Sequence, residues 1–191
     1  MGVVTCFLPS DDGAQTAQHY YIVDSEPELP IDNVQGDLAY TKDTTKLWKA
    51  TGAGAWFEIG GAASEIFIAE NKDTVTIKAG QVVTVHSSGD GVILASATSK
   101  LTYAVGLALV DIDVGMVGVI ATDGPFTLSD WTNTTGTALL IPKSKYYLDT
   151  IPGRLTTVPP SGTNNISQEI GKALSTTKLE ISIEEFIIIA V

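Results

Sequence analysis

The regular spacing of short apolar runs is the feature that most constrains how this 191-residue chain can fold. Short stretches rich in Val, Ile, Leu, Thr and Tyr alternate with clusters of Gly, Asn, Asp and Ser, at the spacing typical of hairpins in a sandwich or barrel. No window of helical periodicity exceeds about two turns. A short helix is expected at most over residues 11–17, where an aspartate can cap the first turn. The pattern therefore predicts an all-β fold.

Aromatic residues mark a small module in the first third of the chain. Segments 36–40, 47–50 and 55–59 are strand-like and are joined by polar turns, which predicts a meander with cross-strand aromatic contacts. Two prolines in residues 25–34 predict an extended loop before it. The small residues 60–64 predict a linker. We expect an N-terminal arm and β-meander module over residues 1–61 and a β-sandwich or β-barrel domain over residues 62–191.

The second domain contains a long series of expected strands. They fall at residues 65–69, 74–78, 81–86, 92–95, 103–112, 117–121, 138–141, 146–148, 168–174 and 179–183, with a hairpin turn at 87–91. So many strands in one domain imply a closed or sandwiched sheet. Pro152 and Gly153 predict a tight turn. Gly106 and Gly171, inside strand-like runs, predict bulges or close approach of another backbone.

Charge and composition exclude several classes of partner. The chain has 11 Lys and Arg against 22 Asp and Glu, a net charge of −11, which disfavours nucleic acid and anionic membrane surfaces. With 44% hydrophobic and 17% charged residues, the composition favours a fully folded chain. The sequence shows neither an apolar run of membrane-spanning length nor a basic leader, so we expect no membrane span and no signal peptide.

The sequence also offers little for metals or cofactors. The single cysteine, Cys6, can form no intrachain disulfide and is too few ligands for structural zinc. Residues 11–13 and 88–91 resemble fragments of calcium loops but lack the remaining ligands at the required spacing. A glycine-rich phosphate loop followed by a helix is absent. We therefore expect no cofactor and no metal.

Catalytic residues are equally scarce. His19 and His86 are the only imidazoles, no serine lies in a nucleophile elbow, and His86 is expected to be a structural histidine. Asp111 and Asp113 point to the same face of an expected strand, where they could share a cation or a proton. Their apolar neighbours favour a solvated acidic edge instead. The sequence therefore predicts a non-enzymatic protein, with this pair as the local candidate should the chain be a depolymerase.

Two apolar groups suggest contact with partners. Residues 184–191 place an apolar run behind two glutamates, and such a tail must be buried either as the last core strand or against another subunit. The aromatics Tyr40, Trp48, Trp56 and Phe57 are expected to build a small core. A platform for stacking carbohydrate is the alternative, whereas a nucleic-acid platform lacks the necessary basic residues.

Two stretches resemble structural proteins of the bacteriophage virion surface. The first is similar to a β-meander module of phage fibre and head-decoration proteins and comprises residues 35–40 (QGDLAY), 43–48 (DTTKLW) and 55–59 (AWFEI). The second resembles capsid-decoration and fibre domains and comprises residues 79–83 (AGQVV), 104–108 (AVGLA), 146–160 (YYLDTIPGRLTTVPP) and 168–175 (QEIGKALS). Because long repeats, heptads and collagen-like tracts are absent, a compact decoration is favoured over a slender fibre.

The resemblance implies a capsid decoration, or cement, protein that binds the outside of an assembled phage head and stabilises it against the pressure of the packaged DNA. It further implies the major capsid protein as partner, a homo-oligomer that is commonly a trimer, synthesis in the host cytoplasm and a final location on the virion surface. Multivalent contacts would supply the adhesion. The apolar tail independently favours a homo-oligomer. The alternative function is a tail- or head-fibre component that binds a host surface glycan.

We expect the N-terminal module, or the arm formed by residues 1–9, to contact the capsid, and the larger domain to form the trimer. The candidate partner-binding residues are Val3, Val4, Phe7, Leu8, Trp48, Trp56, Phe186, Ile187, Ile188 and Ile189.

Overall fold

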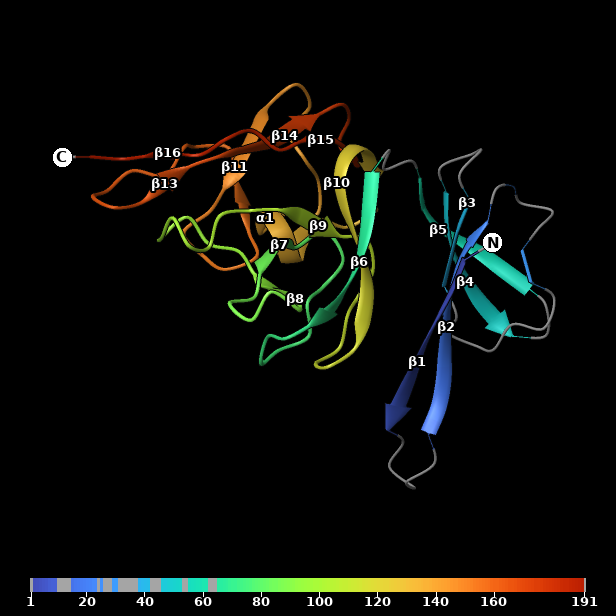
Figure 1. The fold of residues 1–191 in the computed structure, drawn as a ribbon. Helices are drawn as coiled ribbons and strands as arrows, with labels where there is room; N and C mark the ends of the chain where they lie inside the picture. Colours follow the sequence, from blue (N-terminus) through green and yellow to red (C-terminus); the bar gives the residue numbers. More distant parts are fainter. Residues whose placement is uncertain are drawn as a thin grey trace. The chain divides into compact units, whose positions relative to one another are not determined.

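The protein divides into two compact β-rich units, Met1–Ala62 and Ala63–Val191. The structure, a computed structural model (Figure 1), describes residues 2–9, 15–23, 25, 29–30, 38–41, 46–52, 55–61 and 65–190. Before residue 65, side chains are described only at positions 21, 23, 25, 29, 30, 38, 39, 41, 48, 50, 55 and 56. The division between the units falls within the small-residue segment 60–64.

The first unit is built on a five-stranded sheet whose spatial order follows the chain. Its strands are β1 (Gly2–Pro9), β2 (Gln15–Val23), β3 (Leu38–Thr41), β4 (Lys46–Gly52) and β5 (Ala55–Gly61). The β3–β4 and β4–β5 pairs are antiparallel, which confirms the expected meander. Strands β1 and β2 are antiparallel, whereas β2 and β3 run parallel.

Two expectations for the N-terminal segment are wrong. Residues 2–9 are not a separate arm, because β1 pairs along its whole length with β2 and forms one edge of the sheet. The expected helix is absent at residues 15–17, which belong to β2; residues 11–14 lie outside the described residues. The helix propensity of residues 15–17 is weak, and pairing with β1, in which Ala17 lies opposite Phe7, overrides it.

The second unit contains a nine-stranded sheet. In spatial order its strands are β12 (Leu155–Thr156), β11 (Lys145–Leu148), β14 (Glu169–Ala173), β15 (Lys178–Ser182), β10 (Val117–Thr127), β6 (Glu65–Asn71), β8 (Gly91–Leu94), β7 (Val82–Val85) and β9 (Gly106–Ala108). Strand β9 also pairs with β10, so the strands from β10 to β9 close into a small barrel. The remaining strands extend the sheet from the far part of β10.

Strand β10 belongs to both parts of this sheet. Its first half pairs with β6 and β9 in the barrel, and residues 123–127 pair with β15 (Figure 1). The register shifts between Ala121 and Asp123, and Gly124 follows with a φ of 90°. A bulge followed by a left-handed glycine bends a strand, which lets this one leave the barrel and enter the second part of the sheet.

The barrel is filled by aliphatic side chains from its strands and the adjoining segments. The fully buried members of this core cluster are Ile77, Val83, Val92, Ala108, Ile112 and Ile120. Beside them the side chain of Asn71 is completely buried, and its amide donates to the carbonyl oxygens of Val75 (2.9 Å) and Ile112 (2.8 Å). Its Oδ1 accepts from the Asp73 N–H, so the polar group has partners on both sides.

A second buried group lies where the sheet leaves the barrel. Phe126 packs edge-to-face against Trp131 with ring centroids 5.7 Å apart, and the Trp131 Nε1–H donates to the carbonyl of Thr177. Trp131 precedes α1 (Thr132–Thr135), a single helical turn whose first N–H and hydroxyl are bound by Asp130. The hydrogen bonds from Thr132 hold the pKa of Asp130 below its ordinary value. Sequence reasoning missed this helix because four polar residues carry no helical periodicity.

Other strand predictions for the second unit failed where the backbone departs from a ladder. Residues 74–78 make only an isolated bridge, Ile77 with Ile112, and residues 138–141 form no strand. The expected strand over 103–112 shrinks to β9. The two-residue strands β12 and β13 (Ile166–Ser167) are not in the expected series, because such short pairings depend on contacts distant in the sequence. Strand β16 (Ile187–Ile188) lies in the tail, for which a last core strand was one of the two alternatives.

The glycine and turn predictions are confirmed. A Cβ at Gly106 would lie 2.7 Å from the carbonyl oxygen of Ala121, and one at Gly171 would collide with the carbonyl oxygen of Glu180. Gly153 has a φ of 75° and lies in the turn between β11 and β12, where Asp149 N–H donates to the Arg154 carbonyl at 2.9 Å. Close approach of a neighbouring backbone therefore explains why positions 106 and 171 hold glycine.

We expect Gly171→Ala to lower the free energy of unfolding by about 3 kcal/mol, because the methyl group has no space against the β15 backbone. Chemical denaturation measures the loss. Gly115→Ala is the control: a Cβ there meets no atom within 4 Å, so only the φ of 75° is penalised, at about 1 kcal/mol. Equal losses in both variants would contradict the close approach.

Candidate functional site

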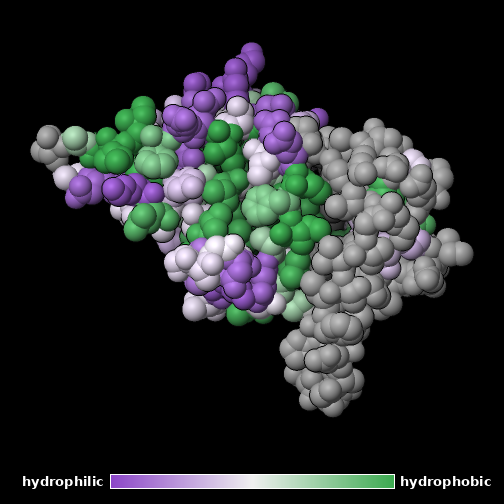
Figure 2. All heavy atoms as spheres, viewed as in Figure 1, coloured by the Kyte–Doolittle hydropathy of each residue, from purple (hydrophilic) through white to green (hydrophobic). Residues whose placement is uncertain are grey.

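The C-terminal segment forms a small ribbon with exposed apolar side chains. Strand β16 pairs antiparallel with β13, with Ile188 opposite Ile166 and Ile187 opposite Ser167; we call these two strands the C-terminal ribbon. Ile166 is fully buried, whereas Ile187 is 71% and Ile188 is 50% exposed. The ribbon extends to the end of the chain in Figure 1, and hydrophobic side chains gather over that end of the unit in Figure 2.

The expectation that the tail is the last core strand is therefore wrong. Of the four residues in the β13–β16 pair only Ile166 is buried, and no further strand of the described chain covers Ile187. Ile189 is half-buried, and its backbone exchanges hydrogen bonds with Asn164 (3.1 Å) and Asn165 (2.9 Å). Burial against another subunit stays a prediction.

A buried glutamine anchors the segment that leads into the ribbon. Gln168, 2% exposed, accepts from the Ala104 N–H at 2.7 Å, and its amide donates to the carbonyl oxygens of Ala104 and Glu184, each at 3.1 Å. The Glu184 N–H also donates to the Glu169 carbonyl. These bonds hold residue 184 beside residues 104 and 169, so the approach to the ribbon is fixed on both sides.

A pocket of about 460 Å³ opens beside this anchor. Its lining residues are Tyr103, Ala104, Gln168, Ile183, Glu184, Glu185 and Phe186. The rings of Tyr103 and Phe186 pack with centroids 5.3 Å apart and planes inclined by 31°. Phe186 is thereby half-buried in its own unit, so among the predicted tail residues Ile187 and Ile188 are the ones that present most apolar surface.

The tryptophans of the first unit lie against its small core. Trp48 and Trp56 pack on the buried cluster of Tyr21, Val23 and Ala39, and the Tyr21 and Trp56 rings meet edge-to-face at 6.0 Å. Both indole N–H groups are engaged: Trp48 donates to Thr41 Oγ1 (3.3 Å) and Trp56 to the Pro30 carbonyl (2.8 Å). Packing of this kind favours the structural role over an open stacking platform.

The structure thus brings some predicted site residues together. Trp48 and Trp56 share one cluster in the first unit, and Phe186 to Ile189 are consecutive in the second. Val3, Val4, Phe7 and Leu8 all lie on β1, and their side chains are outside what the structure describes. The side chains of Tyr40, Phe57 and His19 are outside it as well.

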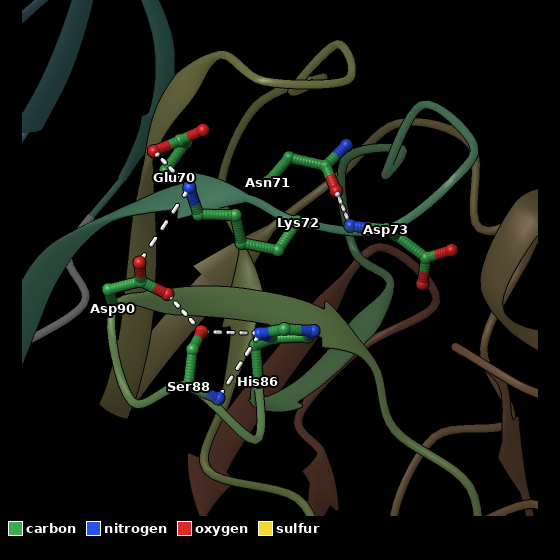
Figure 3. A network of polar contacts seen from close by, with 7 residues as sticks. All are labelled: Glu70, Asn71, Lys72, Asp73, His86, Ser88 and Asp90. Carbon is green, nitrogen blue, oxygen red and sulfur yellow. Dashed lines mark hydrogen bonds and ion pairs between the residues drawn. The ribbon is translucent and has the colours of Figure 1, made fainter.

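His86 belongs to a polar network around the β7–β8 turn (Figure 3). Its Nδ1 lies 2.6 Å from Ser88 Oγ, which donates to Asp90 Oδ1. Lys72 joins the network through Glu70 at 2.8 Å and Asp90 at 3.8 Å, and the hydrogen bond from Lys72 to Glu70 raises the pKa of the lysine. Ser88 lies between His86 and Asp90, so the aspartate does not orient the imidazole as it does in a Ser-His-Asp triad.

Asp111 and Asp113 are committed to structural partners. Asp111 accepts from Lys78 Nζ and from the Ala79 N–H, each at 2.8 Å, and Asp113 accepts from the Thr76 hydroxyl at 2.8 Å. Both carboxylates are exposed, while Ile112 between them is buried, as the alternation in the sequence predicts. The hydrogen bond from Lys78 to Asp111 raises the pKa of Lys78. The pair fastens two segments together and does not converge on a cleft.

In the described part of the chain, no group of three or more His, Cys, Asp or Glu side chains is placed to hold a metal ion. None of the helices among the described residues is long and apolar enough to cross a membrane. No protein-family model and no curated protein matches the sequence.

Sequence reasoning missed most of the pocket. Tyr103, Gln168 and Glu184 come from segments that are separated in the chain, and the local sequence around each does not indicate that they share a site. The two glutamates before the apolar tail were visible in the sequence, but their proximity to Tyr103 depends on the Gln168 anchor. Only a tertiary contact could reveal it.

The hydrogen bond from Ser88 holds the pKa of Asp90 below its ordinary value of 3.8, with Lys72 adding a smaller effect. Because the folded pKa is depressed, the carboxylate contributes its full stabilisation above about pH 4 and loses it as the pH falls through the folded pKa. We expect Ser88→Ala to raise the Asp90 midpoint toward 3.8 in an NMR titration of side-chain carboxyls. Ser87→Ala, in the same turn, is the control and should leave the midpoint in place.

Proposed function

We propose that this protein is a structural component of a bacteriophage virion, a capsid decoration (cement) protein that binds the outer surface of the head and stabilises it. The observation that carries the proposal is the exposed apolar C-terminal ribbon, fixed to a compact β unit by Gln168. An apolar surface held in one conformation is suited to association without a large ordering cost. The resemblance of residues 35–59 and 79–175 to phage surface proteins supplies the biological setting.

The mechanism is multivalent adhesion. Ile187 and Ile188 of several copies pack together in a homo-oligomer, for which we propose a trimer, and each copy bridges capsid subunits. The N-terminal unit, with β1 at the edge of its sheet, contacts the major capsid protein. Since each chain carries a net charge of −11, like-charge repulsion opposes self-association, and apolar contact is what can overcome it.

A fibre component that binds a host glycan is less well supported. Such a role needs exposed aromatic faces, whereas Trp48 and Trp56 are half-buried against the core of the first unit and their indole N–H groups are engaged. An enzymatic role is also less well supported, because the carboxylates of Asp111 and Asp113 serve structural hydrogen bonds.

Location in the virion is the first test. We expect gold-labelled antibodies against this protein to cover the heads of intact particles of the phage that encodes it, seen by electron microscopy. Particles from which the protein has been stripped should lose the label and release DNA at lower temperature. Label confined to the tail would favour the fibre alternative, and unlabelled particles would contradict a virion role.

Self-association is the second test. We expect sedimentation velocity to give a species of three times the mass of one chain, which Ile187→Ser/Ile188→Ser converts to monomer. Moderate salt should strengthen the assembly by screening the repulsion between acidic chains. The matched control is Val75→Ser/Val114→Ser, which removes valines that are 49% and 54% exposed on segments beside the Ile77–Ile112 bridge. An equal effect of both double variants would contradict a specific role of the ribbon.

A further inference from the structure

The pocket beside the ribbon combines aromatic faces with free acidic groups. Tyr103 is 40% exposed and its ring lies against Phe186, so the pair presents π-surface at the pocket wall. The faces of aromatic rings attract cations through the ring quadrupole. An aromatic wall of this kind therefore favours a cationic ligand, provided that negative charge stands nearby.

Glu184 and Glu185 supply that charge. Both side chains line the pocket and are exposed, and neither carboxylate has an ion-pair partner within 4.0 Å among the described residues. The Nζ of Lys145 lies 2.7 Å from Glu169 Oε2, and this hydrogen bond is the main cause of the raised pKa of Lys145. The charge of Glu184 makes only a smaller contribution to that pKa. The acidic pair is thus available to a cation from another molecule.

The remaining polar groups of the lining narrow the choice of ligand. Both amide hydrogens of Gln168 are used by backbone carbonyls, and its oxygen accepts from the Ala104 N–H, so this side chain has no free donor for an anion. No lining residue is a lysine, arginine or histidine. The lining therefore offers carboxylate acceptors and apolar faces, which match a hydrogen-bond donor with a long apolar stem.

We propose that this pocket binds an arginine side chain presented by a partner protein, with its guanidinium stacked on the Tyr103–Phe186 pair and hydrogen bonded to Glu184 and Glu185. Arginine fits better than lysine because its planar group stacks on rings and can bind a carboxylate through two parallel hydrogen bonds. A volume of about 460 Å³ has room for the side chain and the adjoining backbone. The inference goes beyond the decoration role and does not require it.

The test uses the full chain labelled with ¹⁵N and two capped peptides, Ala-Arg-Ala and Ala-citrulline-Ala. Citrulline keeps the shape of arginine but carries no charge. We expect the arginine peptide to produce saturable NMR shifts at the amides of Ala104 and residues 184–186, and the citrulline peptide to produce none. Glu184→Gln/Glu185→Gln should weaken the binding roughly fivefold, and Phe186→Leu should weaken it while keeping the apolar volume.

The matched control is Glu65→Gln/Glu180→Gln, which removes the same charge from β6 and β15 outside the pocket lining and should leave binding unchanged. Equal binding of both peptides, equal weakening in both double variants, or no shifts at millimolar peptide would overturn the proposal. Shifts at the same amides on raising the concentration of the Ile187→Ser/Ile188→Ser variant, which lacks the proposed ribbon contact, would assign the pocket to a second copy and also overturn it. Because the assay contains no capsid, its outcome is separate from the test of virion location.

Discussion

Strand β10 is the element on which both parts of the larger unit depend. Its first half closes the barrel between β6 and β9, and its second half starts the extension through β15. The bulge after Ala121 and the left-handed Gly124 bend the strand, so that it pairs first in the barrel and then with β15. A regular, unbent strand could not pair in both places. One strand therefore carries both Ile120 of the barrel core and Phe126 of the Phe126–Trp131 contact. A change in its bend would disturb both.

Features carried by local pattern could be predicted from the sequence. The meander of β3 to β5 follows from strand-like runs separated by polar turns, and the roles of Gly106 and Gly171 follow from glycines inside such runs. Features that depend on distant partners could not. Residues 74–78 look like a strand but make a single bridge, and α1 is set by the burial of Trp131 and the bonds of Asp130, neither of which has a periodic signal.

The candidate site divides in the same way. The apolar tail is conspicuous in the sequence, and its exposure at Ile187 is consistent with the weight given there to a partner. The alternative of a final core strand failed because the core was already closed by other strands, which the tail's own composition cannot show. The pocket required the Gln168 anchor to bring Glu184 beside Ala104. Gln168 lies 64 positions after Ala104 and 16 positions before Glu184 in the chain.

The exposure of β16 has a consequence for how the protein loses structure. Hydrogen bonds to Asn164, Asn165 and Gln168 hold this end of the chain, but Ile187 is 71% and Ile188 is 50% exposed, whereas the barrel strands pack around fully buried side chains. Opening of β16 exposes little further apolar surface, so we expect it to cost less free energy than opening of the barrel. A protease that acts on the open form would trim the chain back toward Ser182 and leave the barrel folded. An intact C-terminus then reports that the ribbon is covered.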